Sequence, residues 1–233
     1  MTQGVSLTMA ETLPPARSVL VVCAHPDDES FGLGAAVASF VESGSSASVV
    51  CFTRGEASTL GAQGADLGLV RARELSGAAH ELGVSQVELL GYRDGQLADA
   101  SMDELSQHVH QALQRVEADL VLVFDEGGIT GHPDHRRATH AALVAARARD
   151  IPVLAWALAE RVAHDLGREF GATFVGRRDD ELDFLVTVNR TRQLLAISQH
   201  VSQAAENRVL ARRLELQGSQ EVLRWLSPPH LDS

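Results

Sequence analysis

Short apolar runs alternate with longer amphipathic stretches from the start of the chain to about Leu158. The runs are continuous rather than alternating, which is typical of strands covered on both faces. They predict strands at Val19–Cys23, Ala47–Thr53, Val87–Leu90, Leu120–Phe124 and Val153–Trp156. The stretches between them have helical periodicity and predict helices at Gly32–Glu42, Leu69–Leu82, Met102–Glu117 and Pro133–Arg149.

This alternation of strands and helices predicts an α/β protein, with a mostly parallel sheet covered by helices on both faces. Beyond Leu158 the pattern weakens, and it predicts short strands at Thr173–Val175 and Phe184–Val188 followed by helices at Arg190–His200 and Ser202–Leu216. No repeat, low-complexity segment or Gly/Ser linker separates the chain into parts. We therefore expect a loose tail over residues 1–17 and a single domain over residues 18–233.

Two clusters of histidine and acidic residues follow two of the expected strands. Residues 24–29 read Ala-His-Pro-Asp-Asp-Glu directly after the first strand, and His132-Pro-Asp-His135 follows the fourth. In open parallel sheets, sites form beyond the carboxyl ends of the strands, where the strand order reverses. With a strand order of 3-2-1-4-5 the first and fourth strands are neighbours, so both clusters are expected to meet in one site.

The first cluster has the spacing of a tight turn. Pro26 fixes φ and helps to turn the chain, which aims His25 and Asp28 at one point and leaves Asp27 aimed slightly elsewhere. Glu29 is expected to support the start of the following helix rather than to bind a metal, because negative charge favours helix N-termini.

The second cluster has the spacing of a helix start. Pro133 suits the first helical position, with His132 as the cap and His135 on the first turn. His25, Asp28 and His135 then form a two-histidine, one-carboxylate set of the kind that holds a catalytic zinc ion with an open position for water. The competing interpretation is a loop whose carboxylates only cap a helix.

Composition excludes several other classes of function. The net charge of −11 argues against nucleic acid or an anionic membrane as a partner. The chain has no lysine, which excludes Schiff-base chemistry and a P-loop lysine. No apolar stretch approaches the ~20 residues of a membrane-spanning helix, and no basic n-region precedes an apolar segment, so we expect a cytoplasmic protein. Cys23 and Cys51 lie inside apolar runs and are expected to be reduced core residues.

Together, the sequences AHPDDE and HPDH resemble the LmbE/PIG-L family of zinc-dependent de-N-acetylases. Members of this family act on N-acetylglucosaminyl-phosphatidylinositol and on glucosamine intermediates of mycothiol and bacillithiol. The resemblance spans about residues 19–205 and implies a Rossmann-like, three-layer α/β/α fold of LmbE type with one Zn²⁺ per chain. Weaker family segments follow in order at Thr53–Glu56, Arg71–Glu74, Leu82–Val84, Gly91–Gly95 and His200–Gln203.

The same resemblance implies a role for each residue of the two motifs. Asp27 would be the general base that takes a proton from the metal-bound water. His132 would stabilise the oxyanion or protonate the leaving amine, and Asp134 would orient a histidine from behind. The metal ligands would be His25, Asp28 and His135.

Four more residues are candidates for binding the substrate. Arg71 and Asp94 correspond to the arginine and aspartate that hold sugar hydroxyls in family members that bind glucosamine, and Glu56 and His200 lie in other family segments. Each has a plainer interpretation. Arg71 and Glu74 have the spacing of a surface ion pair on a helix, Asp94 suits a turn, Glu56 suits a loop, and His200 suits a buried structural role.

The expected function is therefore hydrolysis of an N-acetyl group on an N-acetylglucosamine-containing small molecule by metal-activated water, in a monomer or a homo-oligomer. The alternatives are an amidase of thiol conjugates using the same site, a metal-dependent phosphoesterase, and a binding protein with a decayed site. Thr130 stands where the mycothiol-pathway deacetylase has a tyrosine that helps catalysis. Either another residue does that work, or the substrate differs.

Overall fold

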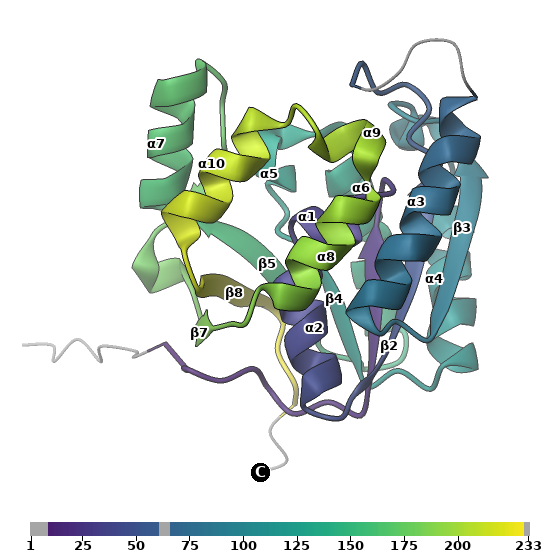
Figure 1. The fold of residues 1–233 in the computed structure, drawn as a ribbon. Coiled ribbons are helices and arrows are strands. Elements are labelled where there is room, and N and C mark those ends of the chain that lie inside the picture. The colour runs from purple at the N-terminus through teal and green to yellow at the C-terminus, as the bar shows by residue number, and fades with distance from the viewer. Residues whose placement is uncertain (1–8, 61–65, 231–233) are drawn as a thin grey trace, which may run out of the picture.

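An eight-stranded, mostly parallel sheet forms the centre of the molecule (Figure 1). The structure is a computed structural model and describes residues 9–60 and 66–230. The strand order β3-β2-β1-β4-β5-β8-β7 confirms the expected order of the first five strands, which pair in parallel. β8 runs antiparallel between β5 and β7, and β6 pairs with β5. The strands are β1 (Ser18–Cys23), β2 (Ser46–Thr53), β3 (Gln86–Tyr92), β4 (Leu120–Phe124), β5 (Val153–Ala159), β6 (Gly176–Arg177), β7 (Phe184–Thr187) and β8 (Gln220–Ser227).

Helices cover both faces of this sheet, which confirms a three-layer α/β/α fold. Figure 1 shows α2, α3 and α8 in front of the sheet and α4 and α6 behind it. None of the described helices combines the length and apolarity needed to cross a bilayer. The α-helices are α1 (Asp28–Phe31), α2 (Gly34–Glu42), α3 (Leu67–Leu82), α4 (Met102–Arg115), α5 (Gly128–Gly131), α6 (Pro133–Arg147), α7 (Glu160–Phe170), α8 (Thr191–Gln199), α9 (Val201–Ala204) and α10 (Arg208–Gln217), and the 3-10 turns are η1 (Leu97–Asp99) and η2 (Asp179–Glu181).

The central strands are buried on both sides, which explains their continuous apolar runs. Val19 and Val21 of β1 belong to the core that contains α2, whereas Leu20 and Val22 belong to the core that contains α4 and α6. Successive side chains of a strand point to opposite faces, so every position of β1 meets a helical layer. Cys23 and Cys51 are register partners on β1 and β2 and are buried as free thiols, as expected of core residues.

After β5 the structure departs from the sequence pattern. The expected strand at Thr173–Val175 is not a strand, and the pairing occurs just beyond it in β6. Neither α7 nor β8 was predicted. The expected helix Ser202–Leu216 is divided into α9 and α10 because the side chain of Asn207 accepts a hydrogen bond from the Leu210 N–H at 2.9 Å and begins a new helix.

The described part of the expected loose tail is attached to the sheet. Ala10 donates its N–H to the Asp183 carbonyl at 2.8 Å and accepts the N–H of Leu185 at 2.9 Å. Further on, the Arg17 N–H donates to Asp119 Oδ1 at 3.0 Å. Residues 9–17 therefore lie along the molecule, and residues 1–8 fall outside the described part of the chain.

Candidate metal centre and active site

The two histidine–carboxylate clusters meet at the carboxyl ends of β1 and β4. These strands are neighbours in the sheet, so the loops that follow them emerge side by side. His25 and His135 are 110 residues apart in sequence, yet His25 Nδ1 lies 3.1 Å from His135 Nε2. The clusters open into a cavity of about 600 Å³ whose lining includes His25, Asp27, Asp28, His132 and His135.

The loop between β1 and α1 holds its backbone in an unusual shape. Asp27 has φ 128° and ψ −25°, a region that residues with a side chain rarely adopt. The next residue stabilises the turn, because Asp28 Oδ2 accepts the N–H groups of Ala24 at 3.0 Å and of His25 at 2.9 Å. The turn leaves Asp28 Oδ1 facing His135 Nε2 at 3.1 Å.

A hydrogen bond behind His135 and two nearby carboxylates behind His25 favour particular positions for the ring protons. His135 Nδ1 lies 3.1 Å from the Gly128 carbonyl oxygen, so it carries the proton and leaves a lone pair on Nε2. His25 Nε2 lies 3.1 Å from Asp94 Oδ1 and 3.4 Å from Asp134 Oδ2, so the proton belongs there and the lone pair on Nδ1. Two imidazole lone pairs therefore point at the same small space.

This donor set fits a bound cation. His25 Nδ1, His135 Nε2 and the two oxygens of Asp28 approach one another at 3.1 to 3.7 Å. Two lone pairs and a carboxylate repel at such distances unless a positive charge lies between them. Tetrahedral zinc with bonds of about 2.0–2.1 Å holds its nitrogen and oxygen ligands roughly 3.3 Å apart, which matches this spacing.

Asp94 and Asp134 support His25 from the opposite side. Asp134 accepts the N–H groups of Gly95 at 2.7 Å and of Leu97 at 3.1 Å, and Asp94 Oδ2 accepts the N–H of Ala57 at 2.9 Å. Burial alone would raise the pKa of both carboxyls, but His25 and the backbone N–H groups outweigh it and lower their pKa. Ligand atoms gather within 4.8 Å in two groups of the described residues, His25 with His132 and His135 and His25 with Asp94 and Asp134. In the second group the contacts to His25 assign both carboxylates to holding its ring in place.

Asp27 points into the cavity beside the metal-type ligands and is paired with Arg71. Asp27 Oδ2 lies 2.9 Å from Arg71 Nη2, while Arg71 also donates to the Gly55 and Pro26 carbonyl oxygens. Burial raises the pKa of Asp27 to about 6, against the lowering effect of the guanidinium. Arg71 lines the cavity as expected, but most of its donors already hold this loop and its carboxylate.

His132 caps α6 in the manner expected from the sequence. Its Nδ1 accepts the N–H of Asp134 at 3.2 Å, and Pro133 takes the first helical position. Because Nδ1 is an acceptor, the neutral ring carries its proton on Nε2, as a donor available to the cavity. Burial and the neighbouring histidines lower the pKa of His132, which favours this neutral form.

His200 and Glu56 make hydrogen bonds within the protein, to Glu29 and Asp94 respectively. His200 is 0% exposed, and its Nε2 lies 2.7 Å from Oε1 of the equally buried Glu29, which agrees with the buried structural role; contact of His200 with a substrate stays a prediction. Glu29 in turn accepts the Asp27 N–H at 2.9 Å, and the pair therefore braces the loop that carries Asp27. Glu56 is exposed and accepts the Asp94 N–H at 3.0 Å. For Glu56, as for Asp94, direct contact with a substrate stays a prediction.

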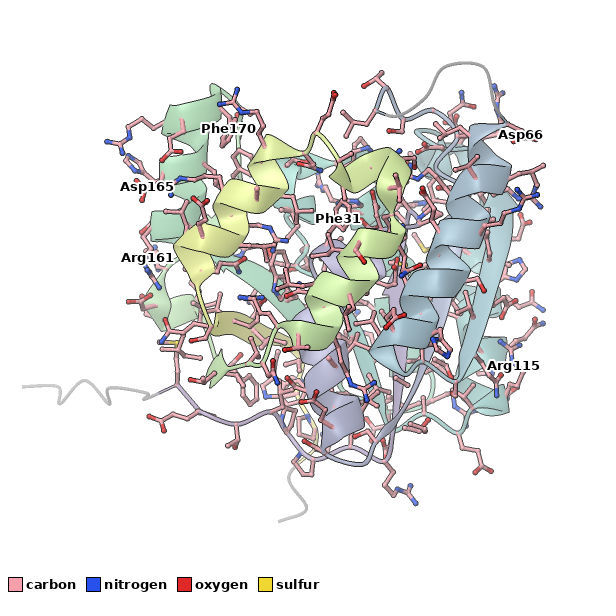
Figure 2. All side chains as sticks on the ribbon, viewed as in Figure 1. Phe31, Asp66, Arg115, Arg161, Asp165 and Phe170 are labelled. Carbon is pink, nitrogen blue, oxygen red and sulfur yellow. The ribbon has the colours of Figure 1, made fainter. Side chains whose placement is uncertain are left out.

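Sequence reasoning missed the apolar wall of the cavity. Phe124, Trp156 and Phe174 line it, together with Arg213 from α10 and Phe31 at the end of α1. Figure 2 shows Phe31 at the middle of the molecule, next to α8 and α10. Trp156 lies in the middle of β5 and pairs with Phe124, the last residue of β4, so its place beside the strand that leads to the second motif was a signal that could have been used. Nothing in the local sequence of Arg213 points to the cavity.

Comparison with known proteins places these observations in a family context. A family model described as GlcNAc-PI de-N-acetylase (PIG-L) matches residues 20–146, more than half of the chain. A 1D-myo-inositol 2-acetamido-2-deoxy-alpha-D-glucopyranoside deacetylase from Salinispora arenicola is 34% identical over 162 residues, which are 59% of this chain and 52% of that protein. A protein of the same description from Streptomyces griseus is 35% identical over 57% of this chain and 49% of its own length. The chain thus spans about half the length of these relatives.

A more distant relative matches over nearly its full length. A Bacillus anthracis protein described as "Probable N-acetyl-alpha-D-glucosaminyl L-malate deacetylase 2" is 26% identical over 220 residues, which are 90% of this chain and 92% of that protein.

Solved structures share the fold at low identity. The A40926 pseudoaglycone deacetylase Dbv21 has a TM-score of 0.68 at 21% identity, covering 93% of this chain and 99% of that chain. The N,N'-diacetylchitobiose deacetylase of Pyrococcus horikoshii has a TM-score of 0.68 at 21% identity, covering 91% of this chain and 84% of that chain. The 4-carboxy-2-hydroxymuconate hydratase GalB of Pseudomonas putida has a TM-score of 0.70 at 20% identity, covering 93% of this chain and 99% of that chain. Proteins with this fold are therefore described as catalysing more than one type of reaction, so the reaction has to be inferred from the residues of the site rather than from the fold.

Proposed function

The chain belongs to the GlcNAc-PI de-N-acetylase (PIG-L) family, and on that premise we propose that it hydrolyses the N-acetyl amide of an N-acetylglucosamine-containing small molecule with the help of one zinc ion. The observation that carries this proposal is the approach of His25 Nδ1 to His135 Nε2 at 3.1 Å, with Asp28 beside them. His25, Asp28 and His135 would hold the ion. A bound zinc ion supplies a Lewis acid for the amide carbonyl and lowers the pKa of water to near ~7.

Asp27 is proposed as the general base. Its carboxylate lines the cavity next to the ligands, and with a pKa raised to about 6 it accepts a proton from water near neutral pH and returns it to the leaving nitrogen. The ion pair with Arg71 and the bond from the Asp27 N–H to Glu29 keep this carboxylate in one orientation. We assign Arg71 and Glu29 to positioning Asp27.

His132 is proposed as the donor to the carbonyl oxygen. Its Nε2–H faces the cavity, and negative charge develops on that oxygen when water adds to the amide. The donor is pre-oriented by the helix cap, so no side-chain motion is required when the charge appears. Asp134 would act indirectly, by holding His25 from behind.

An amino sugar is the proposed substrate class. The inositol-linked and malate-linked substrates named for the relatives both carry an N-acetylglucosamine unit, and the 600 Å³ cavity has room for a sugar with a substituent. Arg71 and Asp94 border the cavity. We propose that each forms further hydrogen bonds to the sugar, in addition to its bonds within the protein. A cytoplasmic location and a homo-oligomeric state stay predictions.

A combined metal and substrate assay tests this proposal. The purified protein is analysed for zinc, magnesium and manganese. The zinc-loaded form is offered N-acetylated glucosides while acetate and free amine are followed together, and a phosphate monoester and a thiol-conjugate amide are offered in parallel assays. The proposal expects about one zinc per chain and equal amounts of the two products. Stoichiometric magnesium without zinc, or release of phosphate in place of acetate, would reject it in favour of a phosphoesterase. Cleavage of thiol-conjugate amides alone would indicate the amidase alternative.

A further inference from the structure

A buried arginine without a neutralising carboxylate lines the far side of the cavity. Arg213 on α10 is 6% exposed, and no described carboxylate oxygen lies within 4.0 Å of its guanidinium nitrogens. Its Nη1 donates to Gln217 Oε1 at 2.9 Å and its Nη2 donates to the Phe31 carbonyl oxygen, both neutral acceptors. A buried charge is normally paired, so this guanidinium has capacity for an anion.

The nearest buried carboxylate is already neutralised by another residue. Glu221 pairs with Arg190, and its Oε2 accepts Trp156 Nε1 at 2.6 Å and Gln217 Nε2 at 3.0 Å. Two arginines therefore share one acid in this part of the core, which leaves one positive charge over. Burial lowers the pKa of Arg213 to about 10, with Arg190 adding to the effect and Glu221 opposing it, as expected for a cation that is incompletely compensated.

The surroundings of Arg213 connect it to the proposed metal centre. Its guanidinium carbon lies 5.0 Å from the centre of the Trp156 ring, which packs on Phe124 at 5.6 Å, and Phe124 in turn packs on His135 at 4.9 Å. The Trp156 and Phe124 rings thus form a wall of the cavity that runs from the guanidinium to a proposed zinc ligand. The wall around it is apolar, which strengthens an ion pair formed there.

We propose that Arg213 forms an anion-binding subsite, and that the substrate carries a carboxylate or phosphate substituent in addition to its N-acetyl group. This inference rests on the proposed deacetylase function and narrows its substrate class. The overall charge of −11 repels anions at long range, so selection for an anionic substrate requires a local cation of this kind.

A matched pair of substrates tests the subsite. The zinc-loaded protein is assayed with the N-acetylglucosaminide of lactic acid and with that of lactamide, which has nearly the same shape without the charge. We expect kcat/KM to favour the acid by roughly tenfold to a hundredfold, the value of a charge-assisted hydrogen bond in a buried site. N-acetylglucosamine 1-phosphate forms a third arm, and a preference for it over the lactate compound assigns the subsite to phosphate.

Variants at two neighbouring arginines separate the subsite from a structural role. In Arg213→Gln the acid-to-amide ratio should fall to about one, because the charge is removed, whereas Arg213→Lys should retain part of the preference. The control is Arg212→Gln on the same helix, where the native side chain pairs with Glu169 and Glu215 at the surface, and it should keep the native ratio. A folding defect lowers both rates together and leaves the ratio unchanged.

Calorimetry with the same two glycosides distinguishes failure of the subsite from failure of the enzyme. If no acetate is released but the acid binds more tightly than the amide in an Arg213-dependent manner, the anion subsite stands and the deacetylase assignment fails. If both glycosides are hydrolysed equally well, or the preference survives Arg213→Gln, the anion subsite is overturned. Absence of binding by either compound rejects both.

Discussion

The part of the molecule from β1 to α6 and the part from β5 to β8 contribute differently to the same cavity. The first part is a regular series of parallel strands and helices, and its strand-end loops hold His25, Asp27, Asp28, His132 and His135. The second part adds an antiparallel strand pair and the helices α7 to α10, and it contributes Trp156, Phe174 and Arg213. The family match ends at residue 146, almost at the boundary between the two.

This difference separates the proposed chemistry from the proposed choice of substrate. Parallel strands bring their carboxyl ends to one edge, which fixes side chains from distant segments at precise spacings around a metal. The C-terminal helices pack over that edge with apolar side chains, where changes alter the shape and charge of the cavity without moving the ligands. Variants in the first part should therefore abolish turnover of every substrate, and variants in the second should alter stability or selectivity.

The largest effect is expected for His135→Ala. This change removes the lone pair that faces His25 and Asp28, so the protein should lose its bound metal, and amide hydrolysis should fall to the background rate. Zinc content by mass spectrometry and acetate release measure the two losses. His140→Ala, an exposed histidine on the same helix, is the control that should keep both. A fully active His135→Ala protein without zinc would contradict the division of roles.

A smaller loss is expected for Asp27→Asn. The carboxylate lies next to the ligands but is not one of them, so zinc should stay bound while kcat falls by about a hundredfold to ten-thousandfold, the range for removal of a general base. Steady-state kinetics with a parallel zinc analysis separates this outcome from metal loss. Unchanged kcat in the zinc-loaded variant would exclude Asp27 as the base.

His132 allows its two roles to be separated. His132→Asn retains a side chain that caps helices well but loses the Nε2–H donor, so kcat should drop by roughly a hundredfold with little change in stability. His132→Ala should show the same drop and, in addition, lose about 1 kcal/mol of unfolding free energy. Kinetics and urea unfolding of both variants give the comparison. Equal stability of the two would show that the cap contributes nothing.

The smallest effect concerns the C-terminal part. Asn207→Ala removes the side chain that accepts the Leu210 N–H at the start of α10, and it should lower the unfolding free energy by about 1 kcal/mol, or Tm by about 2–4 °C. Zinc content should stay at the native level, because α10 carries no proposed ligand. Asn207→Asp keeps a capping oxygen and should restore most of the stability. Loss of zinc in Asn207→Ala would break the separation between the two parts.

The regular part of the fold was predictable because local pattern and tertiary structure agree there. The strands β1 to β5 are buried on both faces, so their apolar runs are visible in sequence, and the turn residues Pro26 and Pro133 mark where loops become helices. β8 escaped prediction because an antiparallel strand at the end of a parallel sheet follows no strand–helix rhythm. α7 was also missed, although it connects the parallel pair β5 and β6, and the helix expected over Ser202–Leu216 proved to be two. The single side chain of Asn207 was enough to begin a separate helix.

By itself, the sequence determined the α/β class and the places of the first five strands, and it predicted the meeting of the two motifs for a strand order of 3-2-1-4-5, since strand ends and tight turns are local features with a fixed spatial consequence. Only the tertiary structure decided that His200 is buried behind Glu29, that Arg71 holds Asp27, and that Arg213 lines the cavity with no carboxylate of the described residues paired to it. Those facts depend on which side chains share a low-dielectric space. Burial and charge compensation are properties of the packed assembly rather than of any segment.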